Sequence, residues 1–301
     1  MIKLDFNETN NEISQILDSN KPASILRIDN TMGYVLHTLN KNEEPVDHIF
    51  SPESLLQGGI YPIDKDYYKQ VIVPHVQNAM VSSDLLGFVD ISGEIFKGDY
   101  VNKFGTEKKM FDSFLVMDPG ALFGYSPQYE KPEVLWTEKL KDKKVLVIST
   151  HVETIKKQWD NIENIWGDRK DQIAPFKLVD VIRSPYHPWM DERQPPNCKH
   201  FLESVNYNKE LIDTYDYDVL LAGCSTSAPM YVDHAKKNGK VGIQTGGVLQ
   251  IFFGIIGYRW TQGEYTPWKD MYNEHWIKPL KEDEAQNRIQ HRHLETNFAY
   301  W

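Results

Sequence analysis

The sequence predicts an α/β fold with a Rossmann-like parallel sheet and flanking helices. Between residues 140 and 260, short apolar runs of strand length alternate with segments whose apolar residues recur at helical spacing. Polar turns, several of them rich in glycine, serine or threonine, separate the two kinds of segment, and this alternation is typical of parallel sheets. A chain of 301 residues is long enough for one large unit of this kind or two small ones.

The Rossmann-like core is expected over residues 136–260. Its strands are predicted at 144–148, 176–182, 218–222 and 240–243. Its helices are predicted at 151–166, 201–213, 229–238 and 247–255. Gly239 follows the third helix, where glycine commonly ends a helix in the left-handed conformation.

The flanking parts of the chain are interpreted as an N-terminal α/β region and a C-terminal tail. The N-terminal region, residues 1–135, is expected to complete the site. Its predicted helices lie at 10–19, 34–39 and 67–81, the last interrupted at Pro74, and its strands at 24–28 and 85–89. Residues 98–133 have little periodicity and are expected to be irregular. The tail, residues 261–301, is polar and aromatic and is expected to wrap the core.

Composition disfavours several classes of protein. Acidic residues outnumber Lys and Arg by 43 to 33 with no block of basic residues, so neither nucleic acid nor an anionic membrane is expected as a partner. The longest nearly apolar run, 248–258, is too short for a membrane span. Two cysteines, Cys198 and Cys224, imply no disulfide framework, and the N-terminus lacks a signal-peptide pattern. A cytoplasmic location is therefore expected.

Two glycine-bearing turns follow the third and fourth core strands. The first, 223–229, contains Gly223, Ser225 and Thr226, and the second, 244–247, contains Gly246 and Gly247. Glycine lets the backbone approach a ligand, and hydroxyls and helix N–H groups can donate to phosphate oxygens. Neither turn is a GxGxxG or Walker motif, so ordinary turn and capping chemistry is the alternative for each.

A third candidate follows the first core strand. His151 and Glu153 place an imidazole beside a carboxylate at the carboxyl end of that strand, where general acid–base chemistry is often found. The spacing of Thr150 and Glu153 equally predicts a helix capping box. That explanation suits Glu153 better than a functional one.

Late in the chain, residues 272–276 combine a carboxylate, an imidazole, an amide and two aromatic rings. Glu274 or His275 could remove a proton from a hydroxyl, and the rings could stack on a sugar or base. The alternative is an aromatic anchor that pins the tail to the core. The tail also holds His291, His293 and Glu295, a weak metal-ligand pattern that solvation explains better.

Several segments of the second half carry a family resemblance. They are 140–148, 153–158, 217–224, 246–250, 253–255, 257–260 and 273–276, with Pro279 and the terminal Tyr300 and Trp301. Together they resemble proteins of polysaccharide and glycan gene clusters, which look like the GT-D class of glycosyltransferases. The resemblance is specific over about 135–301 and thin over the first 130 residues. It implies a GT-D-like fold, a nucleotide-sugar donor (UDP-, GDP- or dTDP-linked) and a glycan acceptor.

The resemblance also implies roles for individual residues. Asp29, Glu274 or His275 would deprotonate the acceptor hydroxyl, and His151 is the next candidate base. The guanidinium of Arg27 or Arg259 would offset the charge of the departing diphosphate. The donor would contact Arg27, Asn30, His151, Gly223, Ser225, Thr226, Gly246, Gly247, Gln250 and Arg259.

One departure from the family pattern concerns the metal. Where the family typically has Arg-Ile-Gly-Asp-Gly-Glu, with a DxE pair for a divalent cation, this chain places Asn30 and Met32 at the acidic positions. Asp29 is the remaining candidate ligand. The missing carboxylates leave two alternatives: a metal-independent enzyme, or one that holds a divalent metal mostly through the donor phosphates. Two other classes stay open: a Rossmann-like oxidoreductase or methyltransferase, although GxGxxG is absent, and a non-catalytic nucleotide- or glycan-binding protein.

Overall fold

The protein is described from a computed structural model, in which residues 2–28, 59–62, 64–88, 115–117, 119–127, 133–184 and 198–283 are placed. The strands are β1 (Ile2–Lys3), β2 (Ala23–Ile28), β3 (Leu85–Phe88), β4 (Leu115–Met117), β5 (Lys144–Ser149), β6 (Lys177–Arg183), β7 (Val219–Gly223) and β8 (Val241–Gln244). Within these placed residues they form one sheet of eight strands in the order β1-β4-β3-β2-β8-β7-β5-β6, and every pairing is parallel. The predicted α/β class with a Rossmann-like parallel sheet is thereby confirmed.

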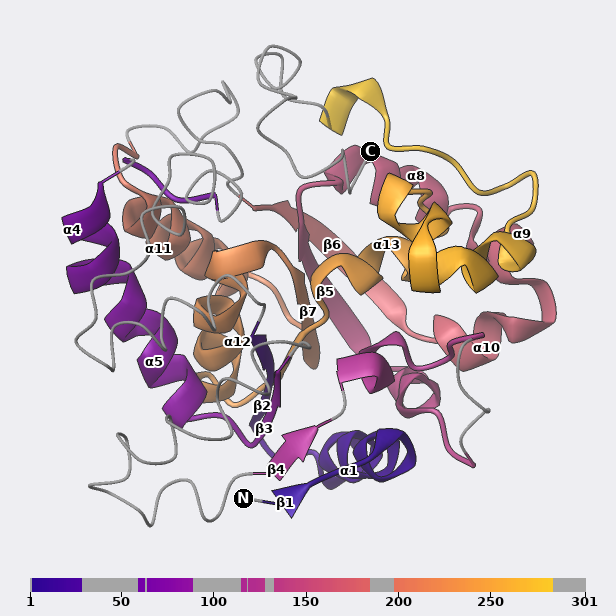
Figure 1. The fold of residues 1–301 in the computed structure, drawn as a ribbon, viewed down its shortest axis with the longest axis horizontal. Helices are drawn as coiled ribbons and strands as arrows, with labels where there is room; N and C mark the ends of the chain where they lie inside the picture. Colours follow the sequence, from indigo (N-terminus) through magenta and orange to yellow (C-terminus); the bar gives the residue numbers. More distant parts are fainter. Residues whose placement is uncertain are drawn as a thin grey trace.

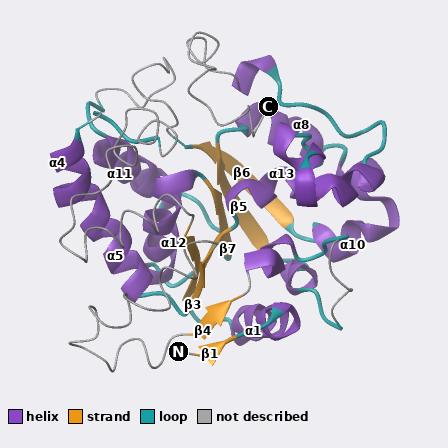
Figure 2. Ribbon diagram, viewed as in Figure 1, coloured by secondary structure: helices purple, strands orange, loops and turns teal. Residues whose placement is uncertain are grey.

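Helices cover both faces of this sheet (Figures 1 and 2). The helices are α1 (Phe6–Ser19), α4 (Lys65–Tyr67), α5 (Val73–Val81), α8 (Val152–Trp159), α9 (Ile162–Trp166), α10 (Lys170–Ile173), α11 (Phe201–Ile212), α12 (Ala228–Lys237) and α13 (Leu249–Phe252). Helices α5, α11 and α12 pack against one face, and α1, α8, α9, α10 and α13 against the other. Among the residues that the structure places, no helix is long and apolar enough to cross a membrane.

Burial on both faces explains why the inner core strands β5, β7 and β8 are largely apolar. On β5, Leu146 and Ile148 contribute to the core under α11 and α12, whereas Val145 and Val147 contribute to the core under α8 and α13. Successive side chains of a strand point to opposite faces, so a strand covered on both sides needs an unbroken apolar run. This is the pattern from which the core strands were predicted, within one or two residues of their ends.

The N-terminal region and the core share the sheet. Strand β2 pairs with β3 on one side and with β8 on the other, so the predicted boundary near residue 135 separates two halves of one sheet. Strands β1 and β4 were not predicted. Strand β4 lies in the stretch expected to be irregular, and both strands are only two or three residues long.

Three predicted helices are divided or shortened in the structure, and the one expected at 10–19 begins four residues earlier, at Phe6. The helix expected at 151–166 divides into α8 and α9 at Asp160 and Asn161, residue types that compete with helical hydrogen bonds. The helix expected at 67–81 consists of α4, a π-helical turn (Tyr68–Ile72) and α5, whose second residue is Pro74. The helix expected at 247–255 is shortened to a 3-10 turn (Gly246–Val248) and α13. The one expected at 34–39 lies outside the described residues.

The strand order reverses direction beside β5. The chain passes from β5 to β6 on one side and returns to β7 on the other side, with α8 and α12 on opposite faces of the sheet. In open α/β sheets, ligands bind outside the carboxyl ends of the strands at such a switch point. This edge is therefore where a site is to be sought.

Candidate functional site

The end of β2 meets the turn after β8 at the carboxyl edge of the sheet. The backbone N–H of Arg27 donates to Oε1 of Gln244 (3.2 Å). Gly246 has φ +60°. A Cβ added there would clash with Nη1 of Arg27, because the two atoms would be much closer than 3.0 Å. The Arg27 guanidinium thus lies directly against the Gly246 backbone, in space that any other side chain at residue 246 would enter.

The turn after β7 packs beside the end of β2 and the turn after β8. A Cβ at Gly223 would lie 2.8 Å from Cδ2 of Leu249 and 2.9 Å from the carbonyl oxygen of Gly246, so glycine allows the two turns to pack together. Ser225 adopts a left-handed conformation (φ +45°), and Thr226 is buried. Six predicted donor contacts therefore belong to three adjacent strand ends: Arg27, Gly223, Ser225, Thr226, Gly246 and Gly247.

Cys224, in the turn after β7, has the wrong environment for a nucleophile. Its burial raises the pKa of the thiol to about 12. The thiolate is the nucleophilic form of cysteine, and it is scarcely populated at neutral pH when the pKa lies so high. Reactions that proceed through a Cys224 thioester or disulfide are therefore disfavoured.

This environment predicts a difference between the two cysteines. In the native protein at pH 8, dithionitrobenzoate should modify Cys198, which is partly exposed, at least tenfold faster than Cys224. Absorbance at 412 nm with and without denaturant measures both rates, and a Cys198→Ser variant identifies the fast thiol. Rapid modification of both thiols in the native protein would contradict the buried environment of Cys224.

His151 follows β5 and is connected to the turn after β8. Its Nε2 lies 3.1 Å from Nε2 of Gln250, and Oε1 of Gln250 accepts a hydrogen bond from the indole N–H of Trp260 (2.9 Å). Arg259 places its Cζ 5.6 Å from the ring centroid of Trp260, within the range of a cation–π contact. His151, Gln250 and Arg259, all predicted donor contacts, are thus linked through Trp260.

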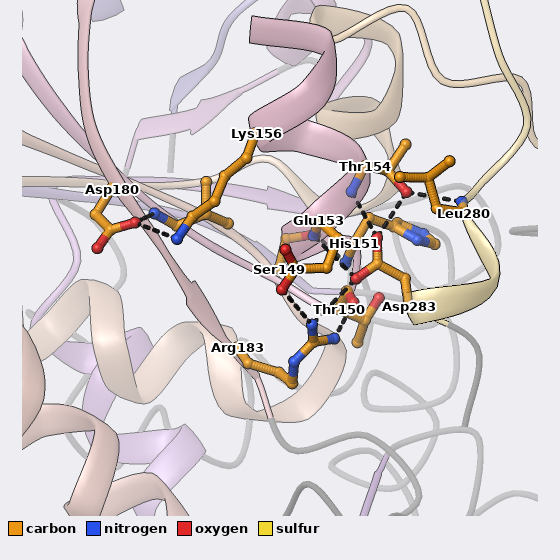
Figure 3. Close-up of polar contacts among 11 residues, drawn as sticks. Ser149, Thr150, His151, Glu153, Thr154, Lys156, Asp180, Arg183, Leu280 and Asp283 are labelled. Carbon is orange, nitrogen blue, oxygen red and sulfur yellow. Dashed lines mark hydrogen bonds and ion pairs between the residues drawn. The ribbon is translucent and has the colours of Figure 1, made fainter. Parts of the chain in front are cut away.

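An acidic residue of the tail caps α8. The Asp283 carboxylate is fully buried and accepts hydrogen bonds from the backbone N–H groups of Glu153 (3.0 Å) and Thr154 (2.7 Å) and from the Thr154 hydroxyl (2.6 Å). It also pairs with Arg183 at the end of β6 (3.1 Å), as Figure 3 shows. Arg183 in turn donates to the carbonyl oxygen of Thr150 (3.0 Å).

The predicted capping box is therefore wrong. His151 occupies the N-cap position of α8 without a side-chain cap, and Glu153 pairs with Arg183 (3.3 Å) instead of reaching back to the backbone. Asp283 supplies the missing acceptor. Neither Arg183 nor Asp283 was selected from the sequence, because no local spacing relates the end of β6 to a residue of the tail.

Glu274 and His275 are not brought to the strand ends. Nε2 of Gln158 donates to the carbonyl oxygen of His275 (3.0 Å). Gln158 lies in the last turn of α8, about 9 Å along the helix axis from the first turn of α8 at the strand ends. Trp276 packs edge-to-face on Trp166 of α9. The Glu274 side chain is 83% exposed. This position supports the alternative, an aromatic anchor for the tail, and gives no support to a catalytic base here.

Candidate metal ligands were also predicted from the sequence. Within the described ranges, no group of three or more His, Cys, Asp and Glu side chains is arranged to hold a metal ion. The residues suggested for a metal, Asp29, His291, His293 and Glu295, lie outside those ranges, as does the predicted donor contact Asn30. Their roles stay predictions.

No protein-family model matches the chain, and neither the curated proteins nor the solved structures include a significant match. The class of the protein is therefore defined by its own fold. It is an α/β protein with a Rossmann-like parallel sheet, and glycine turns and arginines gather at the carboxyl edge of that sheet.

Proposed function

We propose that the protein is a glycosyltransferase that binds the diphosphate of a nucleotide-sugar at the carboxyl ends of β2, β8 and β7. The observation that carries this proposal is the guanidinium of Arg27 lying against the bare backbone of Gly246. A guanidinium beside a backbone without side chains suits a phosphate group, which needs both a cation and close main-chain approach. The resemblance of the second half to the GT-D class supports the same activity.

The proposed reaction transfers the sugar to an acceptor hydroxyl. The hydroxyl oxygen attacks the anomeric carbon, the bond between that carbon and the diphosphate oxygen breaks, and the nucleoside diphosphate leaves with the bonding electrons. Arg27 would stabilise the negative charge that develops on this leaving group. An inverting reaction also needs a base for the hydroxyl proton, and Asp29 is the first candidate.

The positive charge of Arg27 could also replace the charge of a divalent metal ion in this reaction. In the family pattern a divalent cation held by two carboxylates neutralises the diphosphate, and this chain has Asn30 and Met32 at those positions. Arg27, with Arg259 as a second cation, would supply positive charge without those carboxylates. A metal-independent transfer is therefore part of the proposal.

The role of Gly246 is tested by Gly246→Ala. The new Cβ should displace the Arg27 guanidinium, and the affinity for the nucleotide-sugar should fall more than tenfold, ~1.4 kcal/mol in binding free energy. Gly239→Ala is the matched control, because Gly239 also has a positive φ (+79°) but has nothing within 4 Å of an added Cβ. Calorimetry on both folded variants measures the difference. Equal affinities would remove the phosphate role of this turn.

A panel of nucleotide-sugars tests the function itself. UDP-, GDP- and dTDP-sugars are incubated with saccharide acceptors, and release of the nucleoside diphosphate is measured beside binding. Binding with turnover supports a glycosyltransferase, whereas binding without turnover favours a nucleotide-binding protein. If only NAD(P) or S-adenosylmethionine binds, the oxidoreductase or methyltransferase alternative replaces the proposal.

A further inference from the structure

Gln250 lies between two ring systems in the interior, beside the carboxyl edge of the sheet. His151, Gln250 and Trp260 are 4%, 3% and 2% exposed, so water does not compete appreciably for their mutual hydrogen bonds. The Gln250 side-chain amide contacts the His151 ring with its nitrogen end (3.1 Å) and the Trp260 ring with its oxygen end (2.9 Å).

The Trp260 indole decides the orientation of this amide. An indole N–H is only a donor, so the atom of Gln250 that faces it must be the acceptor Oε1. The amide nitrogen, which is only a donor, then faces Nε2 of His151. With the amide reversed, two donors would face each other in a buried site, and this arrangement is costly.

The same chain of donors and acceptors decides where His151 carries its proton. A nitrogen that accepts from the Gln250 amide cannot itself bear a hydrogen directed at that amide. Nε2 is therefore the acceptor, and neutral imidazole then holds its proton on Nδ1. The assignment follows from one obligate donor, Trp260, two hydrogen bonds away.

We propose that Gln250 is a positioning residue that holds His151 as the Nδ1–H tautomer and holds the Trp260 indole beneath the guanidinium of Arg259. The Nε2 lone pair of His151 is committed to Gln250, so His151 is not the base that deprotonates the acceptor. The orientation of Arg259 toward a diphosphate depends on Trp260, and through it on Gln250. The statements about the acceptor base and about the diphosphate rest on the proposed function, whereas the His151 tautomer and the position of the Trp260 indole do not.

The tautomer is measured on ¹⁵N-histidine-labelled protein without ligand, from the two ring-nitrogen shifts of each histidine near pH 8. His151, assigned with a His151→Asn variant, should show a protonated Nδ1 and an unprotonated Nε2. A proton on Nε2 in the unmodified protein would overturn the proposal. This measurement needs no substituted site to fold, and it is independent of any activity.

Gln250→Glu provides the second measurement, because it preserves shape but presents oxygen to both rings. Trp260 can still donate to one oxygen, whereas the other oxygen now requires a hydrogen on Nε2 of His151. The Nε2 signal should therefore change to its protonated position, while the signals of exposed His75 stay unchanged. An unchanged His151 tautomer in this variant, with the introduced carboxyl shown to be ionised by its ¹³C shift, would contradict control by Gln250.

A third measurement follows the Trp260 indole. In Gln250→Leu the indole N–H loses its acceptor, so its proton should exchange with solvent at least about tenfold faster. Unchanged exchange would reject the positioning of Trp260. If these ligand-free results hold and no nucleotide-sugar binds, the proposed function fails while the role of Gln250 in the interior stands.

Discussion

Asp283→Ala should lower the free energy of unfolding by about 3 kcal/mol, the lower end of the range for breaking a buried ion pair. The substitution removes the acceptor of two backbone N–H groups at the start of α8 and one of the two carboxylates that pair with Arg183. The Arg183 side chain is 22% exposed and would remain paired with Glu153, which limits the loss of stability. Urea denaturation followed by circular dichroism measures the change.

Lys281→Ala is the matched control for the tail. Lys281 is exposed and lies in the same 3-10 turn as Asp283, so its replacement should change stability by less than about 0.5 kcal/mol. Asp283→Asn keeps one side-chain oxygen and should fall between the two. A loss below about 1 kcal/mol in Asp283→Ala would show that the tail does not stabilise the start of α8.

Asp29→Asn should lower the turnover number about a hundredfold or more while leaving donor affinity nearly unchanged. The substitution preserves shape and removes a base, and general-base catalysis typically contributes ~10²–10⁴-fold. Asp29 comes directly after β2, whose penultimate residue is Arg27. Steady-state kinetics with the active nucleotide-sugar, beside calorimetry of donor binding, measures both quantities.

Glu274→Gln and His275→Asn serve as controls for this prediction. Both residues lie beside the last turn of α8, away from the strand ends, and should retain turnover within about threefold of the parent. If Asp29→Asn also stays within that range, Asp29 is not the base. The reaction would then use a residue outside this turn or a retaining route without such a base.

The core strands and several helix ends could be predicted from the sequence because their signals are local. Strand β7 was expected at 218–222 and is observed one residue later, since burial on both faces requires a continuous apolar run. Gly239, expected to end α12, has the left-handed φ that favours glycine. Strands β1 and β4 carried too few residues for such a signal.

The site was predictable only in part. The glycine turns after β7 and β8 follow from residue type and from their position after an apolar run, so Gly223 and Gly246 were found without a structure. That Arg27 lies against Gly246 depends on β2 pairing with β8. Backbone hydrogen bonds between parallel strands can join any two apolar runs, so the sequence alone does not specify this neighbour.

The cap of α8 separates the two kinds of information most clearly. From the sequence alone, the spacing of Thr150 and Glu153 satisfied a local rule, because a capping box needs partners only three residues apart. The tertiary structure brings Arg183 to Glu153 and Asp283 to the backbone N–H groups instead. Sequence determined the elements, whose stability is set by local periodicity and burial. Their polar partners were decided by strand order and by the path of the tail, because contacts between distant residues leave no periodic trace in the sequence.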